Sequence, residues 1–437
     1  MFKRRNGSDA AWKYAWSLLG LAIPFILAIL LLHGLRDQIK AFHGSDEIAY
    51  HYPAILRFAQ SFPRVPLQDY SSATTPLFHI VFAALVKIFG PNLPLLRCFD
   101  VLISYGCSVL ALRFFRGELG NDSLTAFLAA LAFTLSPYFF GISFLLLTDN
   151  LATLFTLGAL IPFIHILAEG RRDWTNRDWE SFALAAVCAA LALLTRQLSA
   201  WLLILLAAVV VINPRRLATK AAALAVLGLC VLPTALLFLL WGGPTPPSFR
   251  QHSRLNVAAV AFLASCVGLY ALPFFFVELL RFREWNLRRL PLWAAASAAA
   301  AFVLVWAWPL RYCAGAGCVF PTDGFIWRIA SRLPEVHGSS VIFFALTALG
   351  IGQILWAWNK QGYRSPVIWI FMAYALIIVA NGSTYQKYFD FVALFICLIA
   401  NLEQASRRPL LMRLVLVAFC FGFVAYAVGN PFAPATQ

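Results

Sequence analysis

Residues 15–32 read AWSLLGLAIPFILAILLL, an apolar run without a single charged side chain. About 20 such residues in a helix cross the hydrocarbon core of a bilayer. Runs of comparable length recur along the whole chain, of whose 437 residues 61% are hydrophobic and 12% are charged. Backbone polar groups in lipid must be satisfied within the segment, which favours helices. The sequence therefore predicts an all-α polytopic membrane protein.

The charges between the apolar runs predict the topology. The first run lacks the small-residue cleavage pattern of a signal peptide, and further spans follow it, so we interpret it as a retained anchor. Run 76–89 is too short to cross comfortably. If it lies on the surface, most basic residues in short loops fall on one side, as the positive-inside rule requires. We expect about thirteen spans with the N-terminus inside and the C-terminus outside.

The resulting organisation is one transmembrane domain over residues 1–437 with two sizeable outer loops. The first loop, 33–94, is expected to carry helices that lie on the membrane surface, and the second covers 310–338. The formal net charge of +15 then reports on topology and anionic lipid headgroups, and hardly on nucleic acid. Cys313 and Cys318, in CAGAGC, fall in the second loop. A disulfide between them is left open and requires that the loop face an oxidising compartment.

The stretch GSDEIAYHYP, residues 44–53, places an acidic pair just after the first apolar run. Asp46 and Glu47 suit the first turn of a helix, where carboxylates complement the helix dipole. Glu47 and His51 are four residues apart on a helix and could share a metal ion. A third interpretation makes a carboxylate at the membrane surface the general base for a hydroxyl.

Another carboxylate and two groups of cations lie at predicted helix junctions of the same outer face. Asp149 interrupts the apolar stretch FLLLTDNLATLF, residues 144–155, either as a helix cap or as a group that faces a cavity. Arg196 and Gln197 lie in LALLTRQLSAW, residues 191–201. An arginine there suits a phosphate, or it snorkels to lipid headgroups.

The stretch ANGSTYQKYFD, residues 380–390, places Lys387 between Tyr385 and Tyr388. This arrangement suits a lipid phosphate, or else an aromatic belt with an anchoring lysine. A carboxylate base beside cations that hold a phosphate suits transfer of a group from a lipid phosphate to a hydroxyl. Elsewhere, Arg97 and Asp100 in LLRCFDVL are expected to pair inside the bundle.

The order of these motifs resembles the integral-membrane glycosyltransferases of the GT-C class, which use polyprenyl-phosphate sugars. Within that class, the local similarity is greatest to the dolichyl-phosphate-glucose α-1,2-glucosyltransferase family. The similar segments are SDEIAYHYP (45–53), SATTPLF (72–78), LLTDNLATLF (146–155), TRQLSAW (195–201), WGG…RQH (241–252) and NGSTYQKY (381–388). The stretch SATTP lacks the longer Pro-Gly ending of the eukaryotic enzyme, so the sugar and the linkage stay open.

The resemblance implies an inverting hexosyltransferase with a polyprenyl-phosphate sugar as donor and a hydroxyl of a glycan or glycolipid as acceptor. Asp46 would be the general base, while Glu47 and Asp149 would orient the acceptor or a divalent cation, Mg or Mn; no metal ligands are assigned and no other cofactor is predicted. The residues implied in donor-phosphate binding are Arg196, Gln197, Lys387, Tyr388 and Tyr385. Those implied in lining the substrate cavity are His51, Tyr50, His79, Arg250 and His252.

The Ala/Leu/Arg-rich composition suggests a bacterial inner membrane, with the site facing the periplasm. The alternative function is a lipid or sugar transporter or flippase. Transporters place their polar groups near the bilayer midplane, often in repeated halves. Here the polar groups gather at one face and no internal repeat is visible, which favours an enzyme.

Overall fold

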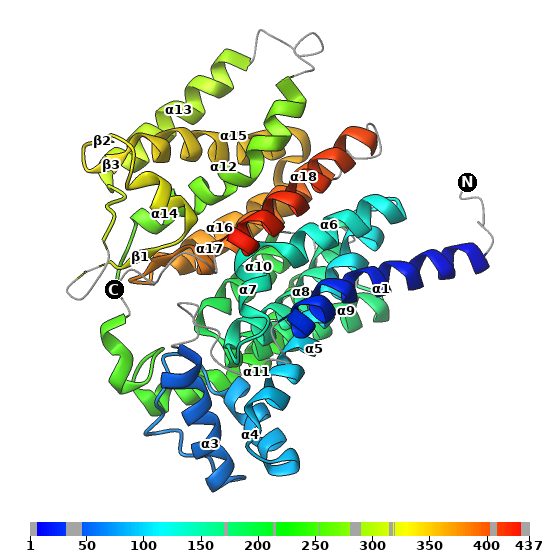
Figure 1. Cartoon of the computed structure of the whole chain (residues 1–437), viewed down its shortest axis with the longest axis vertical. Coiled ribbons are helices and arrows are strands. Elements are labelled where there is room, and N and C mark those ends of the chain that lie inside the picture. Colours follow the sequence, from blue (N-terminus) through cyan, green and yellow to red (C-terminus); the bar gives the residue numbers. More distant parts are fainter. Residues whose placement is uncertain are drawn as a thin grey trace.

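The computed structural model describes residues 7–31, 46–169, 174–212, 216–252, 254–279, 290–313, 318, 320–402 and 409–429. Figure 1 shows a bundle of helices that run roughly side by side. In these ranges, eight helices are long and apolar enough to cross a membrane. They are α1 (Gly7–Leu31), α5 (Leu93–Gly117), α8 (Thr148–Glu169), α9 (Asn176–Thr195), α11 (Leu217–Trp241), α12 (Ala258–Leu279), α15 (Val341–Gln361) and α18 (Pro409–Gly429). The predicted all-α polytopic membrane fold is confirmed.

Shorter helices complete the bundle. The apolar ones are α4 (Leu77–Phe89), α6 (Ser123–Leu135), α10 (Trp201–Ile212), α13 (Leu290–Ala307) and α16 (Pro366–Ile378), beside the buried α17 (Gln386–Leu402). Other short elements are α7 (Pro137–Ile142), η2 (Gln197–Ala200), η3 (Pro247–His252) and η5 (Gly362–Arg364). Helix α4 is only about 20 Å long. The total of about thirteen spans stays a prediction.

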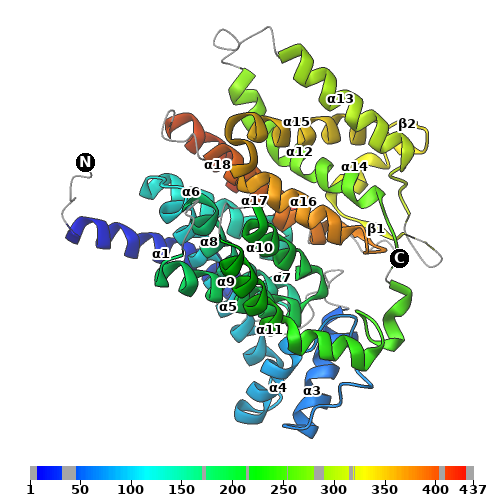
Figure 2. The ribbon, with the colours of Figure 1, turned by 180° about the vertical axis from the view of Figure 1, so that it is seen from behind.

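The polar residues of interest lie at one end of the bundle, which we call the site end. Helices α8 and α17 begin there and α9 ends there, while η2 and α10 follow α9 directly. The segment from Asp46 to α4 packs against this end through η1 (Glu47–His51), α3 (Tyr52–Ser61) and α4, as both views show (Figures 1 and 2). Their buried aromatic side chains form a core of their own with the end of α11, around Phe58, Phe78, Phe82 and Trp241. This core fixes the acidic stretch to the bundle.

A second loop also reaches the site end. Strand β1 (Thr322–Asp323) pairs in parallel with β4 (Thr384–Tyr385), which directly precedes α17. Helix α14 (Phe325–Ala330) and the hairpin of β2 (Glu335–Val336) and β3 (Ser339–Ser340) follow β1. Cys313 and Cys318 form the disulfide that the sequence left open. Since the Thr322 hydroxyl donates to the Cys313 carbonyl at 3.0 Å, the bridged turn is connected through β1 to the start of α17.

Helices α12 and α15 approach each other closely at two glycines. A Cβ atom at Gly268 would lie 1.9 Å from the carbonyl oxygen of Leu346, and one at Gly350 would lie 1.9 Å from that of Ala264. Small residues at helix crossings of membrane proteins permit this close approach. The crossing holds α12 in place beside α17 and hence beside the site end.

Candidate active site

Four charged side chains from separate parts of the sequence meet at the site end. Asp149 lies in the first turn of α8, where a carboxylate complements the helix dipole. Arg196 lies between α9 and η2 in extended conformation, with φ −156° and ψ 125°. Lys387 is the second residue of α17, and Asp46 directly precedes η1. Helix ends therefore supply every one of the four, as the sequence predicted.

The four side chains form two ion pairs. The Arg196 guanidinium donates to the Asp149 carboxylate, and both side chains are about 15% exposed. The Lys387 Nζ atom lies 3.1 Å from Oδ2 of Asp46, with exposed fractions of 8% for Lys387 and 36% for Asp46. Each expected phosphate-binding cation therefore already has a carboxylate as partner, and Asp46 keeps access to solvent.

The aromatic ring of Tyr388 connects the two pairs. The Cζ atom of Arg196 lies 4.8 Å from the ring centroid, and the Nζ atom of Lys387 lies 5.4 Å from it. Cations within about 6 Å of a tyrosine face are attracted by its quadrupole. The ring thus holds both cations at one place.

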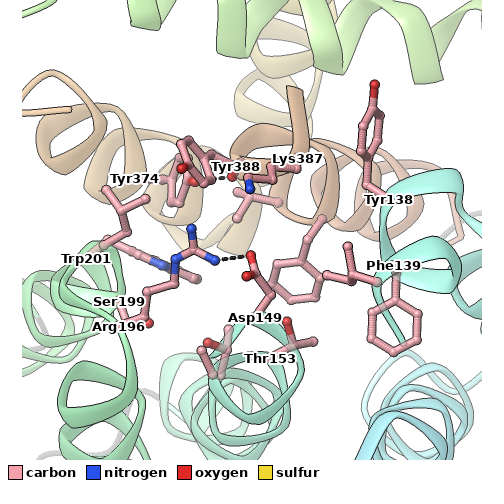
Figure 3. A pocket seen from close by; sticks show the side chains of 16 residues that line it. Tyr138, Phe139, Asp149, Thr153, Arg196, Ser199, Trp201, Tyr374, Lys387 and Tyr388 are labelled. Carbon is pink, nitrogen blue, oxygen red and sulfur yellow. Dashed lines mark hydrogen bonds and ion pairs between the residues drawn. The ribbon is translucent and has the colours of Figure 1, made fainter. Parts of the chain in front are cut away.

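A cavity opens at this place, and Figure 3 shows Asp149, Arg196, Lys387 and Tyr388 around it. Its enclosed volume is about 70 Å³, and it opens toward solvent. Other lining residues, absent from the sequence expectations, include Tyr138, Thr153, Ser199, Trp201 and Tyr374.

Two of these lining residues could have been found from the sequence. Ser199 and Trp201 lie within TRQLSAW, the stretch that was singled out for its arginine. Tyr138 is the second residue of α7, just after an apolar run. Tyr374 lies inside the apolar α16, where only the packing of α16 against α17 and η2 brings it to the cavity.

Glu47 is placed differently from its neighbour Asp46. It is fully buried, and both of its carboxylate oxygens accept from the guanidinium of Arg97. Its Oε1 atom also accepts from the backbone N–H of Leu146 at 2.9 Å. Asp100, the expected partner of Arg97, instead accepts from the Asn150 side-chain amide at 2.6 Å. The structure gives Glu47 the geometry of a positioning residue that connects η1 to α5 and to the segment before α8.

His51 and His79 form a buried chain with Tyr70. Nδ1 of His51 lies 3.0 Å from Nε2 of His79, whose Nδ1 lies 2.5 Å from the Tyr70 hydroxyl. Burial lowers the pKa of His51 to about 4, against the opposing effect of nearby Asp46 and with smaller contributions from Lys387 and Arg196. Both imidazoles are therefore neutral at pH 7, since burial also lowers the pKa of His79.

Four of the other expected site residues, Gln197, Tyr385, Tyr50 and Arg250, are not among the residues that line the cavity. Gln197 donates to the Ala73 carbonyl at 2.9 Å, and Tyr385 lies 5.9 Å from Nζ of Lys387. The ring of Tyr50 packs edge-on against Phe249 at 6.2 Å. Arg250 donates to the Trp241 carbonyl at the end of α11. The side chain of His252 lies outside the described part of the chain.

No group of three His, Cys, Asp or Glu side chains among the described residues is close enough to hold a metal ion. The Glu47–His51 pair does not share a site in the described geometry. Glu47 contacts Arg97, and Nδ1 of His51 faces His79.

Comparison with known proteins supports the functional class. A family model described as dolichyl-phosphate-mannose-protein mannosyltransferase matches residues 73–241, less than half of the chain. The matched region contains Asp149 and Arg196 but neither Asp46 nor Lys387. A search of curated proteins finds no match. The family match and the apolar helices together support a membrane-spanning glycosyltransferase of the GT-C class.

Proposed function

We propose that the protein is an inverting glycosyltransferase that moves a hexose from a polyprenyl-phosphate donor to a hydroxyl of a glycan or glycolipid. One observation carries this proposal: two carboxylates and two cations from four helix ends meet beside one cavity. A phosphate leaving group needs cations, and an attacking hydroxyl needs a base. The specific resemblance to a glucosyltransferase is not needed for this argument, and the hexose stays open.

The proposed roles follow from position. Asp46 is the base, because its carboxylate reaches solvent while that of Glu47 is buried against Arg97. Arg196 and Lys387 hold the phosphate, since both border the cavity and the Tyr388 ring. Asp149 orients the acceptor, since it borders the same cavity and pairs with Arg196. Glu47 and Arg97 hold η1, and hence Asp46, in place.

In the proposed reaction, the acceptor oxygen forms a bond to the anomeric carbon while the bond from that carbon to the phosphate oxygen breaks. The acceptor proton passes to Asp46, and the electron pair of the broken bond stays on the phosphate. A single displacement of this kind inverts the anomeric centre. The phosphate gains one negative charge in the step, which Arg196 and Lys387 are placed to stabilise.

We further propose that the site end faces the periplasm of a bacterial inner membrane. The disulfide between Cys313 and Cys318 lies in a loop at this end, and disulfides persist in oxidising compartments. Arg116, at the opposite end of α5, and Arg216, just before α11, lie at helix ends remote from the site. Basic residues at that end agree with the positive-inside rule.

The test is a transfer assay on purified protein in nanodiscs with a panel of radiolabelled polyprenyl-phosphate hexoses and a membrane lipid extract. Wild type is expected to transfer one hexose, and Arg196→Gln is expected to lose that transfer. Arg413→Gln is the matched control, because Arg413 also pairs with an aspartate, Asp122, at 2.9 Å. If wild type consumes no donor, and if it translocates labelled lipid across the membrane of vesicles that contain the protein, the transporter alternative would be favoured.

A further inference from the structure

The cavity at the site end is charge-balanced before any substrate enters. Arg196 faces Asp149, and Lys387 faces Asp46 (Figure 3 shows the first pair). All but Asp46 are less than one fifth exposed. Ion pairs that are largely shielded from water interact more strongly than exposed ones. A donor phosphate therefore meets two cations that already have partners.

A phosphate that contacts both cations comes close to both carboxylates. Arg196 and Lys387 lie 4.8 and 5.4 Å from the same ring centroid, so one phosphate between them lies near both ion pairs. Like charges at such short separation in a poorly solvated cavity repel strongly. Simple addition of the phosphate to the existing pairs is therefore unfavourable, and replacement of the carboxylates is the lower-energy arrangement.

We propose that the donor phosphate binds by exchange, displacing Asp149 from Arg196 and Asp46 from Lys387. This inference rests on the proposed function, since it takes the ligand to be a phosphate ester. The exchange makes donor binding the event that releases Asp46 from its cation. A carboxylate released from an ammonium group is a stronger base, so the base becomes active only after the donor is in place.

The exchange also accounts for the charge changes of a full turnover. When Asp46 accepts the proton of the acceptor hydroxyl, it becomes neutral and no longer competes for Lys387. The phosphate gains a negative charge in the same step, and Lys387 and Arg196 remain available to it. Loss of the proton from Asp46 to solvent restores the carboxylate, which is 36% exposed, and the carboxylate pairs with Lys387 again once the product phosphate has left.

The experiment measures binding of farnesyl phosphate, a short isoprenoid phosphate, to the full-length protein in nanodiscs. The variants are Asp149→Asn, Asp46→Asn and Arg196→Gln. Because exchange removes a competing carboxylate, each aspartate variant is expected to bind farnesyl phosphate about fivefold more tightly than wild type. Asp122→Asn is the matched control, because it removes the carboxylate of an ion pair to Arg413, which is not among the cavity residues. Asp122 is also the N-cap of α6, and asparagine caps as well as aspartate.

A double-mutant cycle then tests whether Asp149 acts on binding through Arg196. In the Arg196→Gln background, Asp149→Asn is expected to change the affinity by less than about twofold, because the competition that it relieves is no longer present. Thermal unfolding of each variant shows that the fold is kept. Weaker binding by both aspartate variants, or unchanged binding, overturns the exchange, since it means that the carboxylates assist the phosphate or do not compete with it. Failure of wild type itself to bind farnesyl phosphate instead overturns the proposed function.

Discussion

Glu47 and Arg97 form a buried ion pair. Replacing Arg97 alone should therefore destabilise the protein strongly, and replacing both residues should restore most of the lost stability. Their side chains are 0% and 4% exposed, and both oxygens of Glu47 accept from the guanidinium. Removing one partner of a buried pair leaves an uncompensated charge, which costs about 3–5 kcal/mol, whereas replacing both by neutral groups is often nearly neutral. We expect Arg97→Met to destabilise the protein by about 3 kcal/mol or more, and Glu47→Gln with Arg97→Met together to recover most of that loss.

The assay combines thermal unfolding of nanodisc-embedded protein with hexose transfer. If Glu47 serves to position Asp46, transfer should fall with the single Arg97→Met substitution and return in part in the double variant. Glutamine at position 47 keeps an oxygen for the backbone N–H of Leu146, which lies 2.9 Å from Oε1. A stable double variant without any transfer would refute this reasoning and give Glu47 a role in the chemistry.

Further predictions concern packing, pH and the outer loop. Gly268→Ala is expected to lower the free energy of unfolding by at least about 2 kcal/mol, because the new Cβ atom would lie 1.9 Å from a carbonyl oxygen of α15. Gly228→Ala is the neutral control, since no atom lies within 4 Å of its Cβ position. Burial holds the pKa of His51 at about 4, whereas the ordinary value is 6.5. As pH falls, the unfolded chain therefore protonates this histidine at a higher pH than the folded protein does. The free energy of unfolding should fall by up to about 3 kcal/mol as pH drops from 6.5 to 4. In His51→Gln, the stability measured by thermal unfolding should depend less on pH. An unchanged dependence on pH would show that His51 is not its cause. Replacing Cys313 and Cys318 by serine should weaken farnesyl phosphate binding about threefold by loosening support of the cavity wall; unchanged affinity would show that the bridge does not act on the site.

The sequence predicts the fold class and the location of the polar groups because both depend on local composition. Apolar runs of bilayer length are visible without any knowledge of packing, and the candidate span Trp12–Leu30 in α1 covers most of the expected run 15–32. Asp149 and Arg196 stand out because a charge between two apolar runs is costly unless it has a role. Their predicted place on one face of the membrane follows from the alternation of helix ends.

The partners of these groups could not be predicted, because they depend on how helices pack. Asp46 and Lys387 are 341 residues apart in sequence. The expected pairing of Arg97 with Asp100 was wrong: the guanidinium of Arg97 donates instead to Glu47, which is 50 residues away in sequence. A spacing of three residues favours two side chains on one helix face, but a buried carboxylate on a neighbouring element gives the guanidinium a bidentate partner. Local spacing alone cannot show that partner.

The His51–His79–Tyr70 chain illustrates the same limit. The resemblance implied that both histidines line the substrate cavity. In the structure, the aromatic core of α3, α4 and α11 encloses both rings, and their polar atoms face each other. Burial by residues distant in sequence thus turns expected cavity residues into part of the support beneath the site.

The central claim is that Asp46 is the base of a transfer from a lipid phosphate, and the most direct test is single-turnover hexose transfer by Asp46→Asn. The substitution removes the basic carboxylate and changes little in size. The account predicts a loss in rate of about a thousandfold while farnesyl phosphate binds more tightly than to wild type. A transfer rate within tenfold of wild type would contradict the account and leave Asp46 only as the ion-pair partner of Lys387.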